Sequence, residues 1–152
     1  MAEFHYDQLE QNLNLVNRFV LLYSDYMSKA RDYGTGEKLH MVEVHILASI
    51  AENPGIYPTA LARMWDRTKG AISQTVSRLA AKGYVEKRPV AGNHKQIALY
   101  PTDKGWELAE AHRAYDMRGL WANQEFLLAA CTQEELDVFY KVMERYVELL
   151  LD

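Results

Sequence analysis

The stretch LARMWDRTKGAISQTVSRLAAKGYVEKR, residues 61–88, indicates the fold more clearly than any other part of the chain. A short helix is expected to begin after Thr59 as its N-cap and to end near Trp65. After a turn, a second helix is expected over 69–82, with Thr68 as its N-cap. Three apolar residues at helical spacing should turn this second helix toward a core: Ile72, Val76 and Leu79.

A β-ribbon is expected directly after this pair of helices. Two short strands are predicted over 84–88 and 95–100, the second with Ile97 and Leu99 alternating with Gln96 and Ala98. The residues between the strands, Ala91-Gly92-Asn93-His94, are typical of a turn. The order of short helix, turn, helix, strand, turn and strand is that of a winged helix-turn-helix.

Long helices are predicted on both sides of this module. A helix over 7–31 and another over 39–51 precede it, and helices starting at Asp103 and at the capping box Thr132-Gln133-Glu134-Glu135 follow it. The first helix would be about 36 Å long, which is too long for a small domain to cover alone. It carries a heptad-like apolar seam: Leu9, Leu13, Val16, Val20, Tyr23, Met27 and Ala30. A partner helix is therefore implied, within the chain or across a dimer.

The charge of the chain is unevenly distributed. Residues 1–52 carry 4 basic and 8 acidic side chains, residues 53–102 carry 8 and 2, and residues 103–152 carry 5 and 11. The formal net charge of −4 therefore hides a middle segment of +6 between acidic flanks of −4 and −6. A basic segment of this kind is a sequence-level indication of contact with nucleic acid.

Composition excludes several other classes of protein. Hydrophobic residues make up 49% and charged residues 25% of the chain, which are ordinary globular values. No apolar run approaches the ~18 residues of a membrane span, and the polar, acidic N-terminus is unlike a signal peptide, so we expect a cytoplasmic protein without a membrane partner. The sequence contains no nucleophile motif and no phosphate-cradling glycine loop, and we therefore predict that it is not an enzyme.

The outward face of the 69–82 helix has the composition of a recognition helix. Its small and polar side chains remain once the core positions are assigned: Lys69, Gly70, Ser73, Gln74, Ser77 and Arg78. Short side chains let a backbone approach closely, Gln can bond adenine bidentately, and Lys or Arg can reach guanine or phosphate. The alternative reading is an ordinary solvated face. Because further basic residues lie in the same +6 segment, we favour DNA contact.

Residues 61–88 followed by IALYPTDKG, residues 97–105, resemble the MarR family of winged-helix transcriptional regulators. The resemblance covers essentially the whole chain and implies a homodimer in which two winged-helix lobes read a pseudo-palindromic operator in double-stranded DNA. It implies residues 37–102 as the DNA-binding domain, and residues 1–36 and 103–152 as the helical dimerisation region. The fold class is then mainly α with a small β-ribbon, set in a helical dimerisation frame. The expected DNA-contacting residues are Arg63, Arg67, Lys69, Gly70, Ser73, Gln74, Ser77, Arg78, Arg88, Asn93, His94 and Lys95.

The wing tip departs from the family pattern. The family often carries an Asp, one residue and then an Arg there, whereas this chain has Asn93-His94-Lys95. Asn93 cannot pair ionically with an Arg, and Lys95 lacks the planar fork of a guanidinium. Wing contacts are therefore less firmly implied than helix contacts.

The resemblance also implies a signal that releases a repressor from DNA. A small organic effector is one option, with Tyr23, Tyr26, His45 and Trp106 as candidate pocket residues, although such aromatic residues more often belong to a core or a dimer seam. Zinc sensing is a second option, since His45 and His112 match positions used by the zinc-sensing branch. Leu108, one turn before His112, stands where that branch has another histidine, so the ligand set looks incomplete, and no metal or other cofactor is assigned.

Two further alternatives stay open. Cys131, the one cysteine, is either a redox sensor, which requires an exposed thiol of lowered pKa, or a small inert residue. The winged helix itself is either a DNA reader or a protein-interaction module. An interaction module would more often show apolar or acidic side chains where this chain has Lys69, Gln74 and Arg78.

Overall fold

A computed structural model describes residues 6–151, except for the side chains of residues 93–95. The chain forms two compact units, Met1–His112 and Arg113–Asp152. The elements run in the order α1 (Tyr6–Ser28), β1 (Ala30–Asp32), β2 (Lys38–His40), α2 (Met41–Glu52), α3 (Pro58–Met64), α4 (Lys69–Ala81), β3 (Val85–Val90), β4 (Asn93–Pro101), α5 (Asp103–Leu128) and α6 (Gln133–Leu151). The predicted class, mainly α-helical with a β-ribbon, is confirmed.

The first helix is shorter than its sequence pattern predicts. It ends at Ser28, and the next residues form strand β1, which pairs antiparallel with β2. The connecting loop is held by Asp32, whose carboxylate accepts the backbone N–H groups of Gly34, Thr35 and Gly36 at 2.8–3.0 Å. The apolar seam continues into this hairpin as far as Ala30, so periodicity alone could not show where the helix ends.

The short helix α3 begins differently from the prediction. Tyr57 is its N-cap and Pro58 its first residue, so Thr59 lies inside the helix and does not cap it. Proline is favoured at the first helical position because its missing N–H would have no partner there. The two other predicted caps are confirmed: the hydroxyl of Thr68 accepts the N–H of Ala71, and the Thr132–Glu135 capping box forms at the start of α6.

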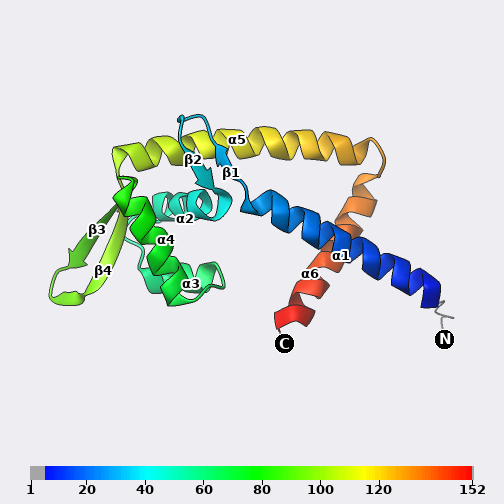
Figure 1. The fold of residues 1–152 in the computed structure, drawn as a ribbon, viewed down its shortest axis with the longest axis horizontal. Helices are drawn as coiled ribbons and strands as arrows, with labels where there is room; N and C mark the ends of the chain where they lie inside the picture. Colours follow the sequence, from blue (N-terminus) through cyan, green and yellow to red (C-terminus); the bar gives the residue numbers. More distant parts are fainter. Residues whose placement is uncertain (1–5, 152) are drawn as a thin grey trace. The chain divides into compact units, whose positions relative to one another are not determined.

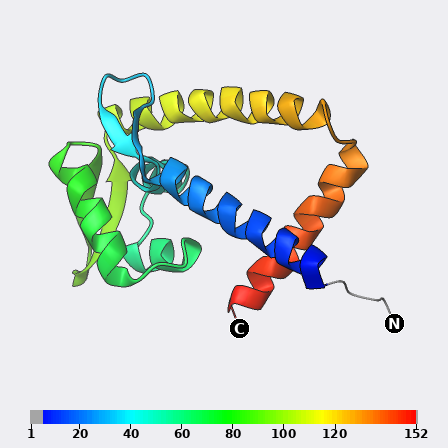
Figure 2. The same cartoon turned by 45° about the vertical axis from the view of Figure 1, so that its right-hand side comes forward.

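The β-ribbon forms as expected, and the contacts of β3 with α4 place this wing beside the helix (Figures 1 and 2). The pairing runs from Val85 opposite Pro101 to Pro89 opposite Ile97, with an irregularity after Pro89. The predicted alternation in β4 is wrong at two positions. Ile97 is 40% exposed, whereas Ala98 and Leu99 are both buried, because the outer end of the ribbon extends beyond the core.

The hydrophobic core lies within the winged-helix module. Helix α4 packs against α2, α3 and β3. The fully buried side chains come from α2, α3, α4 and the segments around them: Leu39, Val44, Ile46, Leu47, Ile50, Leu61, Ile72, Val76, Leu79, Tyr84, Leu99 and Leu108. The three predicted core residues of α4 are all among them. This core fixes α4 in the lobe and leaves its opposite face in solvent.

The long helices have a different character. Helix α1 buries none of its residues within the chain, and Leu136 is the buried residue of α6. Large apolar side chains along both helices are half or more exposed, among them Leu13, Val20, Phe19, Val147 and Leu150. Among the described residues, no helix has the length and apolar character that crossing a membrane requires.

Candidate nucleic-acid interface

Helix α4 separates its residues cleanly between core and solvent. Ile72, Thr75, Val76 and Leu79 are buried on one side. The other side exposes the whole set predicted to face DNA: Lys69, Gly70, Ser73, Gln74, Ser77 and Arg78. The structure therefore places these residues on one accessible helix face, at the helix that the winged-helix order assigns to the major groove.

Gly70 stands at the start of this face without a steric reason inside the chain. A Cβ atom there would meet only the Thr68 hydroxyl, at 4.0 Å. A glycine inside a helix costs stability relative to alanine, and packing within the protein does not require it here. A glycine at this position leaves room for another molecule to approach the helix backbone closely.

The turn between α3 and α4 presents two further predicted residues. Asp66 adopts a positive φ of 45°, and the N–H of Arg67 then donates to the carbonyl of Ala62 at 2.9 Å. Arg67 in this turn and Arg63 in the last turn of α3 are both exposed.

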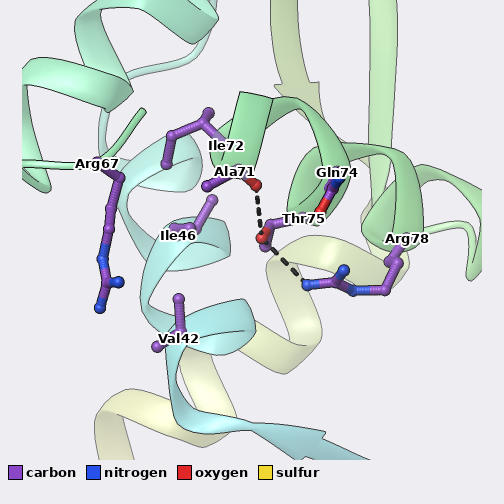
Figure 3. A pocket seen from close by; sticks show the side chains of 8 residues that line it. All are labelled: Val42, Ile46, Arg67, Ala71, Ile72, Gln74, Thr75 and Arg78. Atoms are coloured by element: carbon purple, nitrogen blue, oxygen red, sulfur yellow. Dashed lines mark hydrogen bonds between the residues drawn. The ribbon is translucent and has the colours of Figure 1, made fainter. Parts of the chain in front are cut away.

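A pocket of about 190 Å³ opens between α2, this turn and α4. Figure 3 shows Arg67 and Arg78 on opposite sides of it, with Ile46 and Val42 of α2 between them. Gln74, the predicted adenine-reading residue, also lines the pocket. Arg67, Gln74 and Arg78, all predicted from the sequence to contact DNA, thus line one pocket beside α4.

Arg78 does not extend freely into solvent. Its Nε donates to the Oε1 of Glu43 at 2.9 Å, and its Nη2 donates to the hydroxyl of Thr75 at 3.2 Å. The Glu43 side chain is 6% exposed, against 55% for Arg78. Burial raises the pKa of Glu43, but hydrogen bonds from Arg78 and from the His40 backbone outweigh it and hold that pKa below its ordinary value. The carboxylate is therefore charged and paired with Arg78 of α4.

The wing carries a second cationic group. Arg88 donates to Glu86 through Nε and Nη2, at 3.0 and 2.7 Å, and its guanidinium lies 4.3 Å from the ring centre of Tyr100. The ion pair with Glu86 raises the pKa of Arg88 and lowers that of Glu86. Asn93, His94 and Lys95 belong to β4, but their side chains lie outside the described part of the chain.

The wing is also tied to the recognition face. Lys87 of β3 donates to the hydroxyl of Ser77 on α4 at 2.9 Å. This contact joins a residue predicted to face DNA with a wing residue that the sequence reading counted only as part of the basic segment.

The candidate effector residues occupy different settings. Tyr23 and Tyr26 stack on each other along α1, with ring centres 6.2 Å apart. His45 lies against Trp65 and against the buried His112, at ring-centre distances of 5.8 and 4.6 Å. Trp106, at the start of α5, is 43% exposed.

Three residues that contribute to the candidate interface were not predicted from the sequence. Glu43 and Thr75 are buried polar residues that hold Arg78, and Lys87 contacts Ser77. Thr75 is a polar residue on the apolar side of α4, between Ile72 and Val76. A polar residue at such a position indicates a buried hydrogen bond, so its role could have been predicted from the sequence. The pairing of Glu43 with a residue 35 positions away had no local signal.

Comparison with known proteins agrees with this geometry. A family model described as MarR family matches residues 38–96. The helix-turn-helix transcriptional regulator YhjH of Bacillus subtilis is 27% identical over 107 residues, covering 69% of this chain and 59% of that protein. The chain thus spans less than two thirds of that relative.

Solved structures share the fold. Streptococcus pneumoniae FabT in complex with DNA superimposes with a TM-score of 0.67 at 21% identity, covering 97% of this chain and 99% of that one. The zinc-responsive MarR family member ZitR of Lactococcus lactis gives a TM-score of 0.68 at 19% identity, covering 95% and 97%.

The order of α3, α4, β3 and β4, with one face of α4 exposed, is that of a winged helix-turn-helix. The MarR family model matches the winged helix itself, residues 38–96, so this part of the chain is a winged helix of the MarR type.

Proposed function

We propose that this chain acts as a homodimer that binds a pseudo-palindromic operator in double-stranded DNA, represses transcription in the cytoplasm, and is released by a small organic effector. In this proposal, residues 37–102 form the DNA-binding domain. Residues 1–36 and 103–152 form the dimerisation region, and the chain catalyses no reaction.

The observation that carries the proposal is the exposed polar face of α4 beside the pocket that Arg67, Gln74 and Arg78 line. Basic side chains neutralise phosphates, which supplies affinity for any duplex, while Gln and Arg on a recognition helix can discriminate base edges. The DNA complex of the similarly folded FabT supports DNA binding by a chain of this fold.

Dimerisation is supported by the apolar residues that the chain leaves uncovered. A soluble monomer rarely exposes a large contiguous apolar patch, yet α1 and α6 both expose many large apolar side chains: Leu9, Leu13, Val16, Val20, Tyr23, Phe139, Tyr146, Val147 and Leu150. A second copy of the chain is the partner that this proposal assigns to them. A dimer would also match the two-fold symmetry of a palindromic operator.

The decisive experiment selects bound sequences from a random duplex library with the purified full chain and then measures affinity against salt concentration. The proposal expects an enriched palindromic motif and an affinity that falls steeply with salt, because each phosphate contact releases counterions. Absence of enrichment, together with weak or salt-insensitive binding, would favour the alternative of a protein-interaction module.

Zinc-responsive regulation is a second candidate that one observation favours. His45 and His112 bring two imidazole rings within 4.6 Å of each other, and ZitR is a fold relative described as zinc-responsive. Asp116 stands one helical turn after His112 in the sequence of α5, a position that the sequence reading did not consider. Structural zinc sites need about four ligands, so the two histidines alone are not a full set.

Equilibrium dialysis with Zn²⁺ separates the two candidates. A zinc regulator should bind stoichiometric metal at micromolar concentration and lose it in both His45→Ala and His112→Ala variants. Its operator affinity should also change with zinc. Binding of less than one ion per chain, or retention in both variants, would leave the organic effector as the signal.

A further inference from the structure

We propose that Glu43, a buried residue of α2, is a positioning residue for DNA recognition that fixes the guanidinium of Arg78 and the setting of helix α4. The inference rests on the proposed operator binding by α4. It assigns a role in sequence discrimination to a side chain that does not itself face DNA.

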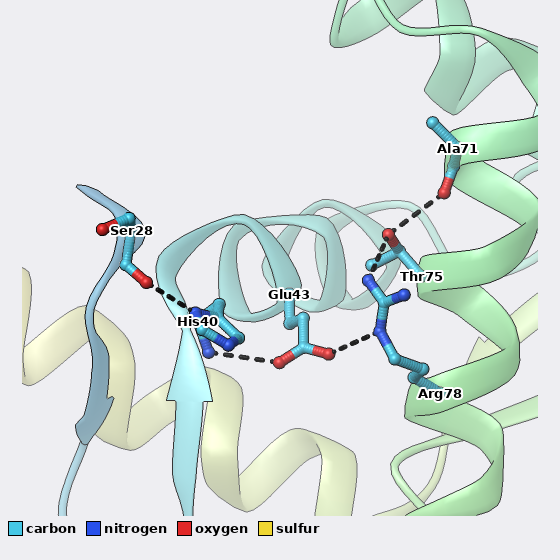
Figure 4. Close-up of polar contacts among 6 residues, drawn as sticks. All are labelled: Ser28, His40, Glu43, Ala71, Thr75 and Arg78. Atoms are coloured by element: carbon cyan, nitrogen blue, oxygen red, sulfur yellow. Dashed lines mark hydrogen bonds and ion pairs between the residues drawn. The ribbon is translucent and has the colours of Figure 1, made fainter. Parts of the chain in front are cut away.

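Figure 4 shows the contacts that connect the two helices. Glu43 accepts from Arg78 Nε through one carboxylate oxygen at 2.9 Å and from the His40 backbone N–H through the other at 3.1 Å. Arg78 also donates to Thr75, whose hydroxyl donates to the carbonyl of Ala71 at 3.1 Å. The guanidinium is therefore held between two buried groups, one on each helix.

The charge of Glu43 is difficult to explain as a contribution to affinity. A carboxylate beside a DNA-binding face lowers the local positive potential, and pairing with it neutralises a cation that could otherwise attract phosphate. A buried ion pair is also weak evidence for stability, since desolvation offsets much of its attraction. The role that remains is geometric, because a buried ion pair can hold its two side chains in one conformation among several.

The geometry suits that role. An Arg side chain has five N–H donors in a planar fork, and the contacts with Glu43 and Thr75 use two of them. The Arg78 side chain is still 55% exposed, so the remaining donors can reach a base or a phosphate. Since one edge of the fork is anchored, its plane is set before DNA arrives, which favours bidentate recognition over a loose charge contact.

The same network reaches the last turn of α1. The ring Nδ1 of His40 lies 2.8 Å from the carbonyl oxygen of Ser28, and His40 supplies the backbone N–H that Glu43 accepts. The contacts thus run from α1 through His40 and Glu43 to Arg78.

The test compares the full-length chain with a Glu43→Gln variant of nearly identical shape. Affinity is measured for the selected operator and for a scrambled duplex at several salt concentrations. The positioning role expects a ratio of operator to scrambled affinity lower by about tenfold, as for the loss of one bidentate contact, while affinity for the scrambled duplex stays equal or increases. Loss of a purely structural contact would instead weaken both duplexes together.

Glu86→Gln is the matched control, because it also removes one carboxylate paired with an exposed arginine of the same lobe. It should raise affinity for both duplexes and leave their ratio unchanged. Arg78→Lys is the second variant, informative even if Glu43→Gln folds poorly, since it keeps the charge and removes the fork. It should lower the ratio as Glu43→Gln does, and combining the two should lower it no further.

The inference would be overturned if the ratio of operator to scrambled affinity were unchanged in Glu43→Gln or in Arg78→Lys. It would also be overturned if Glu86→Gln lowered that ratio as much as Glu43→Gln does. These outcomes differ from failure of the proposed function. If the unmodified chain shows no sequence preference, the proposed function and this inference fail together. If it selects an operator and either the Arg78 or the Glu43 variant retains that selectivity, only the inference fails.

Discussion

The backbone of Gly105, in the first turn of α5, lies directly against the carbonyl group of Tyr84. That carbonyl also accepts the N–H of Thr102, whose own hydroxyl donates to the carbonyl of Gly83 at 2.7 Å and accepts the N–H of Gly105. The end of α4, the start of the wing and the start of α5 therefore meet at one point. This junction holds the wing in place relative to the recognition helix.

Replacing Gly105 with alanine should destabilise the protein by about 1–3 kcal/mol, as overpacking of a core does, because the added methyl group would overlap the Tyr84 carbonyl oxygen. Urea unfolding measures the change. Gly119→Ala on the same helix is the control, since nothing lies within 4 Å of its Cβ position. Alanine there should stabilise by about 0.5–1 kcal/mol, and a similar loss in both variants would contradict the role of this junction.

Thr68→Ala should weaken the recognition helix by about 1 kcal/mol, the usual cost of losing an N-cap. Its hydroxyl accepts the N–H of Ala71 at 3.2 Å, and no methyl group can replace that bond. Thr59→Ala provides the comparison, because Thr59 is exposed and lies inside α3. Thermal unfolding should separate the two variants, and equal effects would argue against the cap.

The stability contributed by Glu43 should depend on pH. Its pKa in the folded chain lies below the ordinary value of 4.5, so this contribution is present above that value and is lost as pH falls through the folded pKa. The difference in unfolding free energy between the unmodified chain and Glu43→Gln should therefore be largest near neutral pH and shrink in acid. Urea titrations from about pH 7 to about pH 3.5 measure this; a constant difference would rule out a charged Glu43.

Substitutions of Gln74 and Arg88 should affect DNA binding in different ways. Gln74→Ala removes a side chain from the α4 face and should relax sequence preference by about 1–3 kcal/mol at the position that it reads. Arg88→Ala removes a wing cation and should weaken all duplexes alike, with a salt slope lower by about one. Binding to the selected operator and to single-base variants distinguishes the effects, and equal losses of selectivity would refute this division of roles.

Charges placed on the exposed seam of α1 should dissociate the proposed dimer. Leu13 and Val20 are 59% and 55% exposed in the single chain, and burying a Glu at either position would cost far more than it gains. Sedimentation analysis should give a dimer for the unmodified chain and a monomer for Leu13→Glu combined with Val20→Glu. A matched pair of changes at the polar residues Gln11 and Arg18 should leave the mass unchanged, and a monomeric unmodified chain would refute the proposal outright.

Local signals predicted the winged helix well. Thr68 caps α4, its core residues recur at helical spacing, and the glycine turn between two β-rich segments gives the wing. The errors lay at element boundaries. The seam of α1 continues in phase into β1, and Pro58 displaces the cap from Thr59. After α1, the loop that Asp32 holds follows the helix although the apolar periodicity continues. At α3, the preference of proline for the first helical position outweighed the preference of threonine for the N-cap.

The candidate site, too, has features that the sequence predicted and features that only the structure shows. The sequence by itself determined which helix faces solvent with polar and basic side chains, since helical periodicity and the choice of apolar residues are local properties of residues 69–82. Only the tertiary structure decided that Arg78 is paired with Glu43, that Lys87 contacts Ser77, and that His45 lies against His112. These contacts join residues from different elements, and their geometry follows from how the core packs those elements together, which no spacing along the chain records.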